Sequence, residues 1–426
     1  MAEQYNVTSL TRLGEGIAQN KSGDQVLVHG GLPGDSVTGL LLDGVIDTPE
    51  HITKSPDHLE PPCPDYGKCG GCSFQHAKAH RYAEWKRGLL IAALSDRGIE
   101  ANIGQLQLAE PASRRRASFS IRHTQSGVEL GFQKARSHEI VVFEDCKVIL
   151  PVLNKARGAI KALAKAALPL MAADAKPTSA LVTVTKTGLD VALSNVERLN
   201  SNRREAALQI ALKANFARLS INGELIVETR KPIIEFDGLP VRLPAGAFLQ
   251  AVQPIENAMR DLVAEHLKGT KRVADLFSGC GTFTLPLARA HHVHAVEMEQ
   301  ASLNALDQAW RASEGLKTVT TDRRDLFERP LKRDELDQFD GLVFDPPRSG
   351  AAEQAAELAN SSVERVVAVS CNPETLARDL KTLVAGGYQI KSVTPFDQFI
   401  WTHHLEAVAL LDKPRRKATK AARQGW

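Results

Sequence analysis

One cysteine near the C-terminus, Cys371, stands where an α/β enzyme holds a nucleophile. It closely follows the apolar run 365–369, which is typical of a buried strand. In sheets covered by helices on both faces, functional groups gather at the carboxyl ends of the strands. We therefore predict that Cys371 attacks a substrate. The alternative is a buried cysteine that only packs at the end of its strand.

Two carboxylates are expected at the same edge of the sheet. Asp345 follows the apolar run 341–344, and the two prolines after it stiffen its loop by fixing φ. If residues 390–396 and 406–411 form a terminal hairpin, Glu406 begins the last strand at this edge. A thiol, a carboxylate and a cofactor would then converge.

This combination fits the methylation of a pyrimidine carbon. C5 of a pyrimidine is too weak a nucleophile to attack a sulfonium methyl group directly, so a thiolate must first add to C6. A base must later remove the C5 proton so that the thiol can leave. We predict Cys371 as the nucleophile and Glu406 as the base. An ordinary thiol has a pKa of about 8.5, so we expect a polar site that lowers the pKa of Cys371.

A glycine turn after residues 273–277 predicts a cofactor site. Asp275, Gly279 and Gly281 follow the spacing Asp-x-x-x-Gly-x-Gly, and the next strand ends at Glu297, which could bind ribose hydroxyls. Thr284 occupies the third glycine position of a dinucleotide fingerprint. The turn therefore favours S-adenosylmethionine over a dinucleotide. A turn that serves only helix packing is the alternative.

The remaining cysteines indicate a metal or cluster site. Cys63, Cys69 and Cys72 share one short glycine-rich loop, and Cys146 can supply a fourth thiol, whereas Cys280 lies in the glycine turn and is expected to pack there. Four thiolates could hold zinc or an iron–sulfur cluster equally well. In a reducing cytosol, such spacing favours metal binding over disulfides.

Length and composition limit the classes of protein. The chain has 426 residues, 24% of them charged, and a net charge of +3, so overall charge does not indicate a nucleic-acid binder. No run of about 18 apolar residues predicts a membrane helix, and the N-terminus lacks the pattern of a signal peptide. We expect a soluble cytoplasmic protein with no membrane contact.

The pattern of elements predicts several domains. Short strands and turns over residues 5–53 predict a small β-barrel, and continuous apolar strands after residue 238 alternate with helices as in a Rossmann-like domain. Expected helices span 77–97, 153–167 and 252–267. Hairpins are expected over 118–132 and 180–193, and strands at 273–277, 293–296, 341–344, 365–369, 390–396 and 406–411. We divide the chain into a barrel (1–55), a central domain with the cysteines (56–237), an α/β domain (238–412) and a basic tail (413–426).

A basic patch could contact RNA. It consists of Arg114, Arg115, Arg116, Arg122, Lys134 and Arg136, with Phe119 and Phe132 nearby to stack bases. The alternative is the solvated face of a hairpin. For the tail, with Lys420 and Arg423, a solvated chain end is expected ahead of an RNA contact.

Three motifs together resemble the RNA uridine C5-methyltransferase family that forms 5-methyluridine. They are Asp345-Pro-Pro-Arg, Ser370-Cys-Asn-Pro-Glu-Thr-Leu-Ala-Arg-Asp and His404-Leu-Glu-Ala-Val. The resemblance implies that Cys371 is the nucleophile and Glu406 the base. It also implies S-adenosylmethionine contacts from Gln250, Phe277, Glu297 and Asp345, with Asp325 as a further candidate on the adenine side.

The resemblance is to the iron–sulfur branch that modifies 23S ribosomal RNA. It implies a multidomain fold with a small OB-like, TRAM-like β-barrel, an α+β central domain with a 4Fe-4S cluster on Cys63, Cys69, Cys72 and Cys146, and an α/β Rossmann-like class I methyltransferase domain. The expected partner is RNA, with 23S ribosomal RNA favoured over transfer RNA, and the chain is expected to be a monomer. The alternatives are a transfer-RNA uridine methyltransferase, an RNA or DNA amino-methyltransferase that uses Asp345-Pro-Pro, and a non-catalytic iron–sulfur protein that binds RNA.

Overall fold

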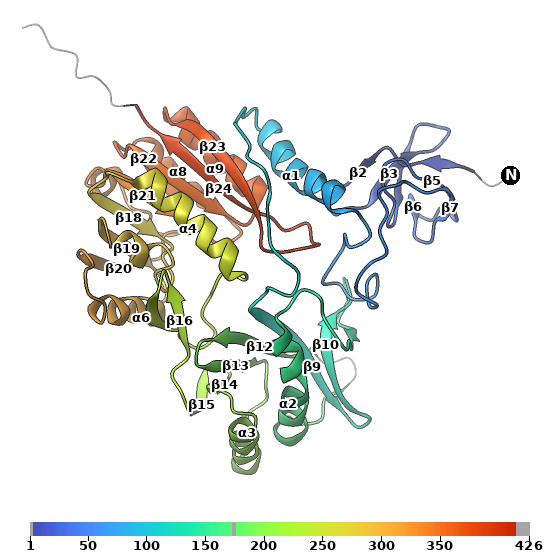
Figure 1. The fold of residues 1–426 in the computed structure, drawn as a ribbon, viewed down its shortest axis with the longest axis horizontal. Helices are drawn as coiled ribbons and strands as arrows, with labels where there is room; N and C mark the ends of the chain where they lie inside the picture. Colours follow the sequence, from blue (N-terminus) through green and yellow to red (C-terminus); the bar gives the residue numbers. More distant parts are fainter. Residues whose placement is uncertain (1–2, 136, 173–175, 415–426) are drawn as a thin grey trace, which may run out of the picture.

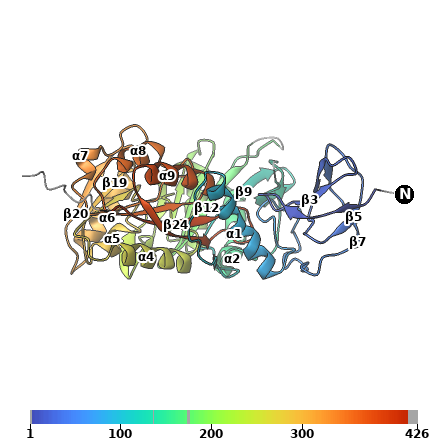
Figure 2. The same ribbon diagram turned by 90° about the horizontal axis from the view of Figure 1, so that it is seen from above.

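The computed structural model describes residues 3–135, 137–172 and 176–414. The N-terminal strands lie at one end of the long axis and strands β19 and β20 lie at the other (Figure 2). Arg136 of the expected basic patch, and Lys420 and Arg423 of the tail, lie outside the described residues. In the described part of the chain, every helix is too short or too polar to cross a membrane.

Two small sheets form the N-terminal region, where the sequence predicts a barrel. One has the order β1 (Tyr5–Asn6), β5 (Ser36–Thr38), β7 (Glu50–Thr53), and the other β2 (Ser9–Leu10), β3 (Gly16–Gln19), β4 (Gln25–Val28), β6 (Val45–Ile46). Both contribute to one apolar core, which includes Tyr5, Ala18, Val28, Val37 and Ile46. This shared core explains why such short strands remain paired.

A seven-stranded sheet lies in the lower part of the molecule as viewed in Figure 1. Its order is β11 (Ile140–Val141), β10 (Gly127–Gln133), β9 (Arg116–Thr124), β12 (Thr178–Thr185), β13 (Gly188–Ser194), β14 (Arg218–Ile221), β15 (Glu224–Glu228). Helices α2 (Pro151–Ala167) and α3 (Ser201–Lys213) share the core of this sheet. The two hairpins and α2 match the sequence prediction, whereas α3, β14 and β15 were not predicted.

An eight-stranded sheet carries the Rossmann-like part of the fold. Its order is β20 (Val319–Arg323), β19 (His292–Glu297), β18 (Arg272–Leu276), β21 (Gly341–Phe344), β22 (Arg365–Ser370), β24 (Glu406–Asp412), β23 (Gln389–Asp397), β8 (Gln107–Leu108). Strand β24 runs antiparallel between β22 and β23, as the predicted terminal hairpin requires. Apart from the edge strand β8, this arrangement agrees with the Rossmann-like domain that the sequence predicts.

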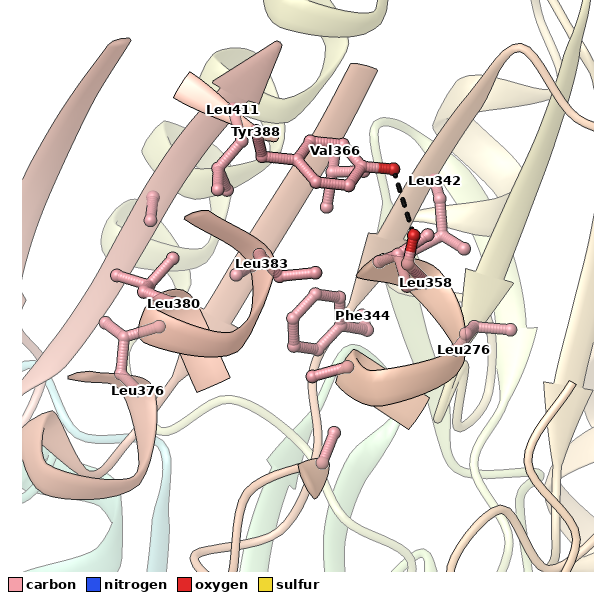
Figure 3. Close-up of a cluster of buried hydrophobic side chains, with 14 of the residues drawn as sticks. Leu276, Leu342, Phe344, Leu358, Val366, Leu376, Leu380, Leu383, Tyr388 and Leu411 are labelled. Atoms are coloured by element: carbon pink, nitrogen blue, oxygen red, sulfur yellow. Dashed lines mark hydrogen bonds between the residues drawn. The ribbon is translucent and has the colours of Figure 1, made fainter. Parts of the chain in front are cut away.

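Helices cover both faces of this sheet. Helices α4 (Gln253–Leu267), α5 (Thr284–Leu287) and α6 (Gln300–Arg311) lie on one face, and α6 also packs on the hairpin of β16 (Ile233–Phe236) and β17 (Leu239–Arg242). Helices α7 (Arg333–Leu336), α8 (Ala352–Ala359), α9 (Pro373–Ala385) and α1 (Ala79–Ser95) lie on the other. The apolar core under α7, α8, α9 and α1 includes Phe344 (Figure 3). In this core the hydroxyl of Tyr388 donates a hydrogen bond to the carbonyl of Leu358 over 3.4 Å.

Segment 79–108 joins the Rossmann-like sheet although it precedes the central sheet in sequence. Leu90 and Leu94 of α1 belong to the same core as α9, and β8 pairs in parallel with β23. The chain therefore reaches the C-terminal sheet first, builds the central sheet, and then returns. As a result, α1 can contact the loops that follow β23.

Candidate active site

The register of two neighbouring strands brings Cys371 and Glu406 together. Ser370, the last residue of β22, pairs with Ala407 of β24. Cys371 is the residue after Ser370, and Glu406 is the residue before Ala407, so the thiol and the carboxylate lie at the same end of the paired strands. Glu406 is 2% exposed, whereas Cys371 is partly exposed. The thiol is thus open to a substrate and has a buried carboxylate beside it.

The charge around Cys371 differs from the sequence prediction. Burial, together with the nearby carboxylates of Glu406 and Asp345, raises the pKa of this thiol to about 12, and Arg348 opposes the shift. The prediction of a lowered pKa was therefore wrong for the free protein, because it counted neither the burial of the thiol nor the repulsion by the two carboxylates expected at the same sheet edge. At neutral pH the free thiol is protonated.

Two glutamines link Glu406 to Asp345. Gln398 Nε2 donates to Glu406 Oε2 and to Gln250 Oε1, both over 2.6 Å, and Gln250 Nε2 donates to Asp345 Oδ2 over 2.9 Å. Gln250 and Gln398 are each 1% exposed. We refer to the two carboxylates, Glu406 and Asp345, and the two glutamine side chains that connect them by hydrogen bonds, Gln398 and Gln250, as the amide-linked carboxylates.

Both of these carboxylates bind protons more tightly than usual. Burial raises the pKa of Asp345 to about 7, and the hydrogen bond from Gln250 opposes this shift. Burial and the charge of Asp345 raise the pKa of Glu406, and the hydrogen bond from Gln398 again opposes the rise. Carboxylates with raised pKa values beside a thiol are typical of acid–base chemistry.

The glycine turn at β18 can cradle a ligand. Gly279 has a φ of +53°, and a Cβ there would meet no atom within 4 Å, whereas a Cβ on Gly281 would lie 2.5 Å from Leu306 of α6. Gly279 therefore leaves open space, and Gly281 serves helix packing. Phe277 at the start of the turn has a positive φ of 60°, a strained backbone of the kind found at ligand sites.

Asp275 and Glu297 flank this turn. Asp275 is fully buried, accepts a 2.5 Å bond from Thr284 Oγ1, and its other oxygen has no hydrogen-bond partner. Burial raises the pKa of Asp275 to about 7. Glu297 accepts from the amide of Gly279 and from the amides after β19. An orphaned buried oxygen and open space above Gly279 fit a ligand with a cationic group, such as S-adenosylmethionine.

Asp325 lies in the loop after β20. Its Oδ1 accepts from the amide of Phe327, and the Phe327 ring lies 5.5 Å from the ring of Phe277 between centroids. Phe327 is 39% exposed. The two rings thus extend the cofactor turn toward Asp325 with a surface on which a planar base could stack.

Comparisons with known proteins identify the family of this chain. Residues 179–414 match the model of the family described as tRNA (uracil-5-)-methyltransferase. The chain is similar to an uncharacterized RNA methyltransferase of Mesorhizobium japonicum, with 46% identity over 98% of this chain and 100% of the relative. The chain belongs to this family. It is accordingly an RNA (uracil-C5)-methyltransferase that uses S-adenosylmethionine.

Two further similarities extend over nearly the whole methyltransferase. A 23S rRNA (uracil(1939)-C(5))-methyltransferase of Shewanella sediminis is 30% identical over 95% of each chain. The crystal structure of a Pyrococcus abyssi tRNA (uracil-54, C5)-methyltransferase with S-adenosyl-L-homocysteine has a TM-score of 0.74 at 21% identity, over 96% of this chain and 99% of that one. The second likeness concerns the fold.

The cysteine loop that carries Cys63, Cys69 and Cys72 touches the end of β10, and Cys146 lies between β11 and α2. The amide of Gly70 donates to the carbonyl of Gln133 over 3.1 Å, and a Cβ on Gly70 would lie 2.6 Å from the amide nitrogen of Ala135. Each of the four cysteine residues is half-buried, and their thiols lie within electrostatic reach of one another, although in the described residues no three of these sulfurs lie within 4.8 Å of one another. Burial raises the pKa of Cys72 to about 12, which is unfavourable for thiolates unless a cation binds them.

A second group of possible metal ligands lies in the N-terminal region. In the described ranges, donors from Asp35, His51 and His58 come within 4.8 Å of one another. Asp35 already accepts from the amides of Leu32 and Ser55 and from His58 Nε2. These bonds satisfy both carboxylate oxygens, so the group is explained as a support for the loops after β4 and β7.

The predicted basic patch is largely structural. Arg115 is 6% exposed, binds Glu256 over 2.6 Å and donates to the carbonyl of Gln250, while Arg122 and Phe119 are also buried. The prediction of a continuous RNA-binding patch was therefore wrong for these residues. The alternation of β9 directs Phe119 into the protein, whereas Arg115 precedes the strand and Arg122 is buried out of step with that alternation.

Two residues at or near the site were missed in the sequence. Gln398 follows β23 and carries no motif, and Phe248 is an apolar residue whose exposure of 67% appears only in the structure. The guanidinium of Arg116 lies 5.7 Å from the Phe248 ring centre. Phe248 stands two residues before Gln250, so this exposed ring lies close in sequence to the amide-linked carboxylates.

Proposed function

We propose that this protein methylates C5 of a uridine in 23S ribosomal RNA, with Cys371 as the nucleophile and Glu406 as the base. The observation that carries the proposal is the register of β22 and β24, which sets the thiol beside a buried carboxylate. An amino-methyltransferase would need neither group, and a non-catalytic RNA-binding protein would need no acid–base pair.

In this mechanism, Cys371 gives its proton to solvent and its sulfur adds to C6 of the uracil, so that the π-electron pair of the C5–C6 bond shifts toward C5. S-adenosylmethionine supplies the methyl group that C5 takes up, and S-adenosylhomocysteine is released. Glu406 then accepts the C5 proton. The C5–H electron pair restores the C5–C6 double bond, the C6–S bond breaks, and Cys371 leaves as a thiolate.

The raised pKa of Cys371 determines when the thiolate forms. With a pKa of about 12 in the free protein, the thiol is not ionised before substrate arrives. Arg348 is the cationic residue that acts on this thiol, and its guanidinium lies 3.2 Å from His404 Nδ1. We expect deprotonation to accompany RNA binding, when the target base leaves its stack and enters the site.

The proposed cofactor contacts come from Gln250, Phe277, Glu297, Asp325 and Asp345. Glu297 would bind ribose hydroxyls, Asp325 would face the adenine side, and Asp345 with Gln250 would lie near the methyl-bearing end. The unpartnered oxygen of Asp275 supports a cationic group beside the glycine turn.

We further propose that Cys63, Cys69, Cys72 and Cys146 hold a 4Fe-4S cluster. Their mutual electrostatic influence and partial burial support one shared centre. The reaction above has no redox step, so the cluster would be a structural link between residues 63–72 and the segment at Cys146, between β11 and α2. The N-terminal sheets would act as a TRAM-like RNA-binding module of a monomeric enzyme.

The choice of RNA rests on the relative from Shewanella sediminis, whose name states 23S rRNA. Transfer RNA is the competing substrate, because the family description and the Pyrococcus abyssi structure name it. The test uses total RNA from cells that lack the gene, incubated with the purified protein and methyl-labelled S-adenosylmethionine. Label in 5-methyluridine of 23S rRNA is the expected result, and label confined to transfer RNA would contradict the proposed substrate.

A further inference from the structure

Gln398 makes a complete set of buried hydrogen bonds at the centre of the site. Its Nε2 donates to Glu406 Oε2 and Gln250 Oε1, each over 2.6 Å, and its Oε1 accepts from the amide of Ala251 over 2.8 Å. The side chain is 1% exposed. A glutamate could not donate these two bonds, and a methionine of similar length could make none of the three.

Side chains from a helix that packs on the sheet hold the backbone on either side of Gln398. The preceding residue, Asp397, is fully buried and accepts from Lys86 Nζ and, over 2.5 Å, from the hydroxyl of Tyr82. Lys86 also donates to the carbonyl of Phe399 over 2.9 Å. Tyr82 and Lys86 belong to α1, so this helix fixes the loop on both sides of Gln398.

The hydrogen bond from Gln398 engages one oxygen of Glu406. In the described part of the chain, Glu406 Oε2 receives the Gln398 bond, and Oε1 receives no side-chain donor. A donor to one oxygen fixes the rotation of the carboxylate and favours its charged form against the burial that raises its pKa. Glu406 Oε1 is thereby left as the oxygen that can take a proton.

We propose that Gln398 is the positioning residue for the base of the reaction. This role rests on the function proposed above. Gln398 orients Glu406 for removal of the C5 proton, and it connects Glu406 through hydrogen bonds to Gln250 and Asp345 on the cofactor side. Its loss slows the step after methyl transfer, in which the C5–H pair restores the double bond and the C6–S bond breaks.

The experiment compares Gln398→Met with the wild type on in-vitro-transcribed, unmodified 23S rRNA and methyl-labelled S-adenosylmethionine in single-turnover mode. Total label on RNA reports methyl transfer, and label in a denaturation-resistant protein–RNA adduct reports the step before release. Gln389→Met is the matched control, because Gln389 begins the same strand with an exposed side chain. Gln398→Asn keeps an amide one methylene shorter and replaces Gln398→Met should that variant not fold.

Methyl transfer is expected within about threefold of the wild type, while release slows roughly tenfold or more, the effect of losing a hydrogen bond to a charged group. The methylated adduct should therefore accumulate, as it should in Glu406→Gln, and Gln389→Met should release normally. Equal slowing of both steps, a loss of S-adenosylmethionine affinity alone, or normal release would overturn the role of Gln398. Absence of any adduct in Glu406→Gln as well would instead count against the proposed function.

Discussion

Cys371 and Glu406 are neighbours because Ser370 of β22 pairs with Ala407 of β24. The two residues are 35 positions apart in sequence, and only the antiparallel insertion of β24 beside β22 brings them together. The nearby carboxylate makes the thiol harder to ionise, because burial and the charge of Glu406 raise the pKa of Cys371 to about 12.

Alkylation of Cys371 should depend on the charge of Glu406. In Glu406→Gln the pKa of the thiol should fall, because a negative charge beside it is removed. The thiolate fraction at pH 8 then increases, and iodoacetamide should modify Cys371 several-fold faster than in the wild type. Peptide mass spectrometry after timed quenching measures this, with buried Cys280 as the internal reference. An unchanged rate would show that Glu406 does not control the thiol.

Binding of S-adenosylmethionine should strengthen as the pH rises from 6 to 8. The pKa of Asp345 is about 7, so its carboxylate gains charge over this interval and attracts the cationic ligand more strongly. Asp345→Asn should make the pH dependence shallower, and Asp275 should account for part of what remains because its pKa is also about 7. Calorimetric titration at several pH values is the measurement. Identical slopes in Asp345→Asn and wild type would contradict a role for Asp345 in binding.

Replacing Lys86 should destabilise the fold. Lys86 and Asp397 are both fully buried, and Lys86→Met leaves the Asp397 carboxylate without its cationic partner. Removing one member of a buried pair costs about 3–5 kcal/mol. Urea unfolding measures the free energy of unfolding, with Lys213→Met on exposed α3 as the control. A loss no larger than that of the control would show that the pair does not stabilise the junction of α1 and the site.

The exposed ring of Phe248 should contribute to RNA affinity. Phe248 is 67% exposed, and Arg116 lies over its ring, as in a stacking platform with a nearby cation. Loss of one base stack costs about 1–3 kcal/mol, so Phe248→Ala should weaken RNA binding roughly tenfold or more. Filter binding to a 23S rRNA transcript is the measurement, and Leu212→Ala, another exposed apolar side chain, should bind normally. Equal affinities of the two variants would exclude Phe248 from the RNA interface.

The sequence predicted those parts of the fold whose physical signal is local. Continuous apolar runs marked β21 and β22, and the terminal hairpin placed Glu406 at the edge with Cys371. Strand β20 was missed because its residues, Val-Thr-Thr-Asp-Arg, are mostly polar at the edge of the sheet. Strand β8 was missed because two residues cannot show a period.

The charge and hydrogen bonding of the site could not be predicted in the same way. Arg115 looked like a phosphate ligand, yet it is buried against Glu256, which is 141 positions away. Gln398 carries no motif, and its role depends on contacts with Gln250 and Glu406 that only the fold creates. The pKa of Cys371 likewise depends on carboxylates from two other strands, so residue type alone gave the wrong sign.

The most direct test of covalent catalysis by Cys371 uses 23S rRNA transcribed with 5-fluorouridine. The anaerobically purified protein is incubated with this RNA and S-adenosylmethionine, and adducts that survive denaturation are mapped by mass spectrometry. Fluorine at C5 cannot leave as a proton, so Glu406 cannot complete the reaction and the C6–S bond should persist. We predict a methylated adduct on Cys371 that is absent in Cys371→Ala. Methylation of unsubstituted RNA by Cys371→Ala, with no adduct in the wild type, would contradict it.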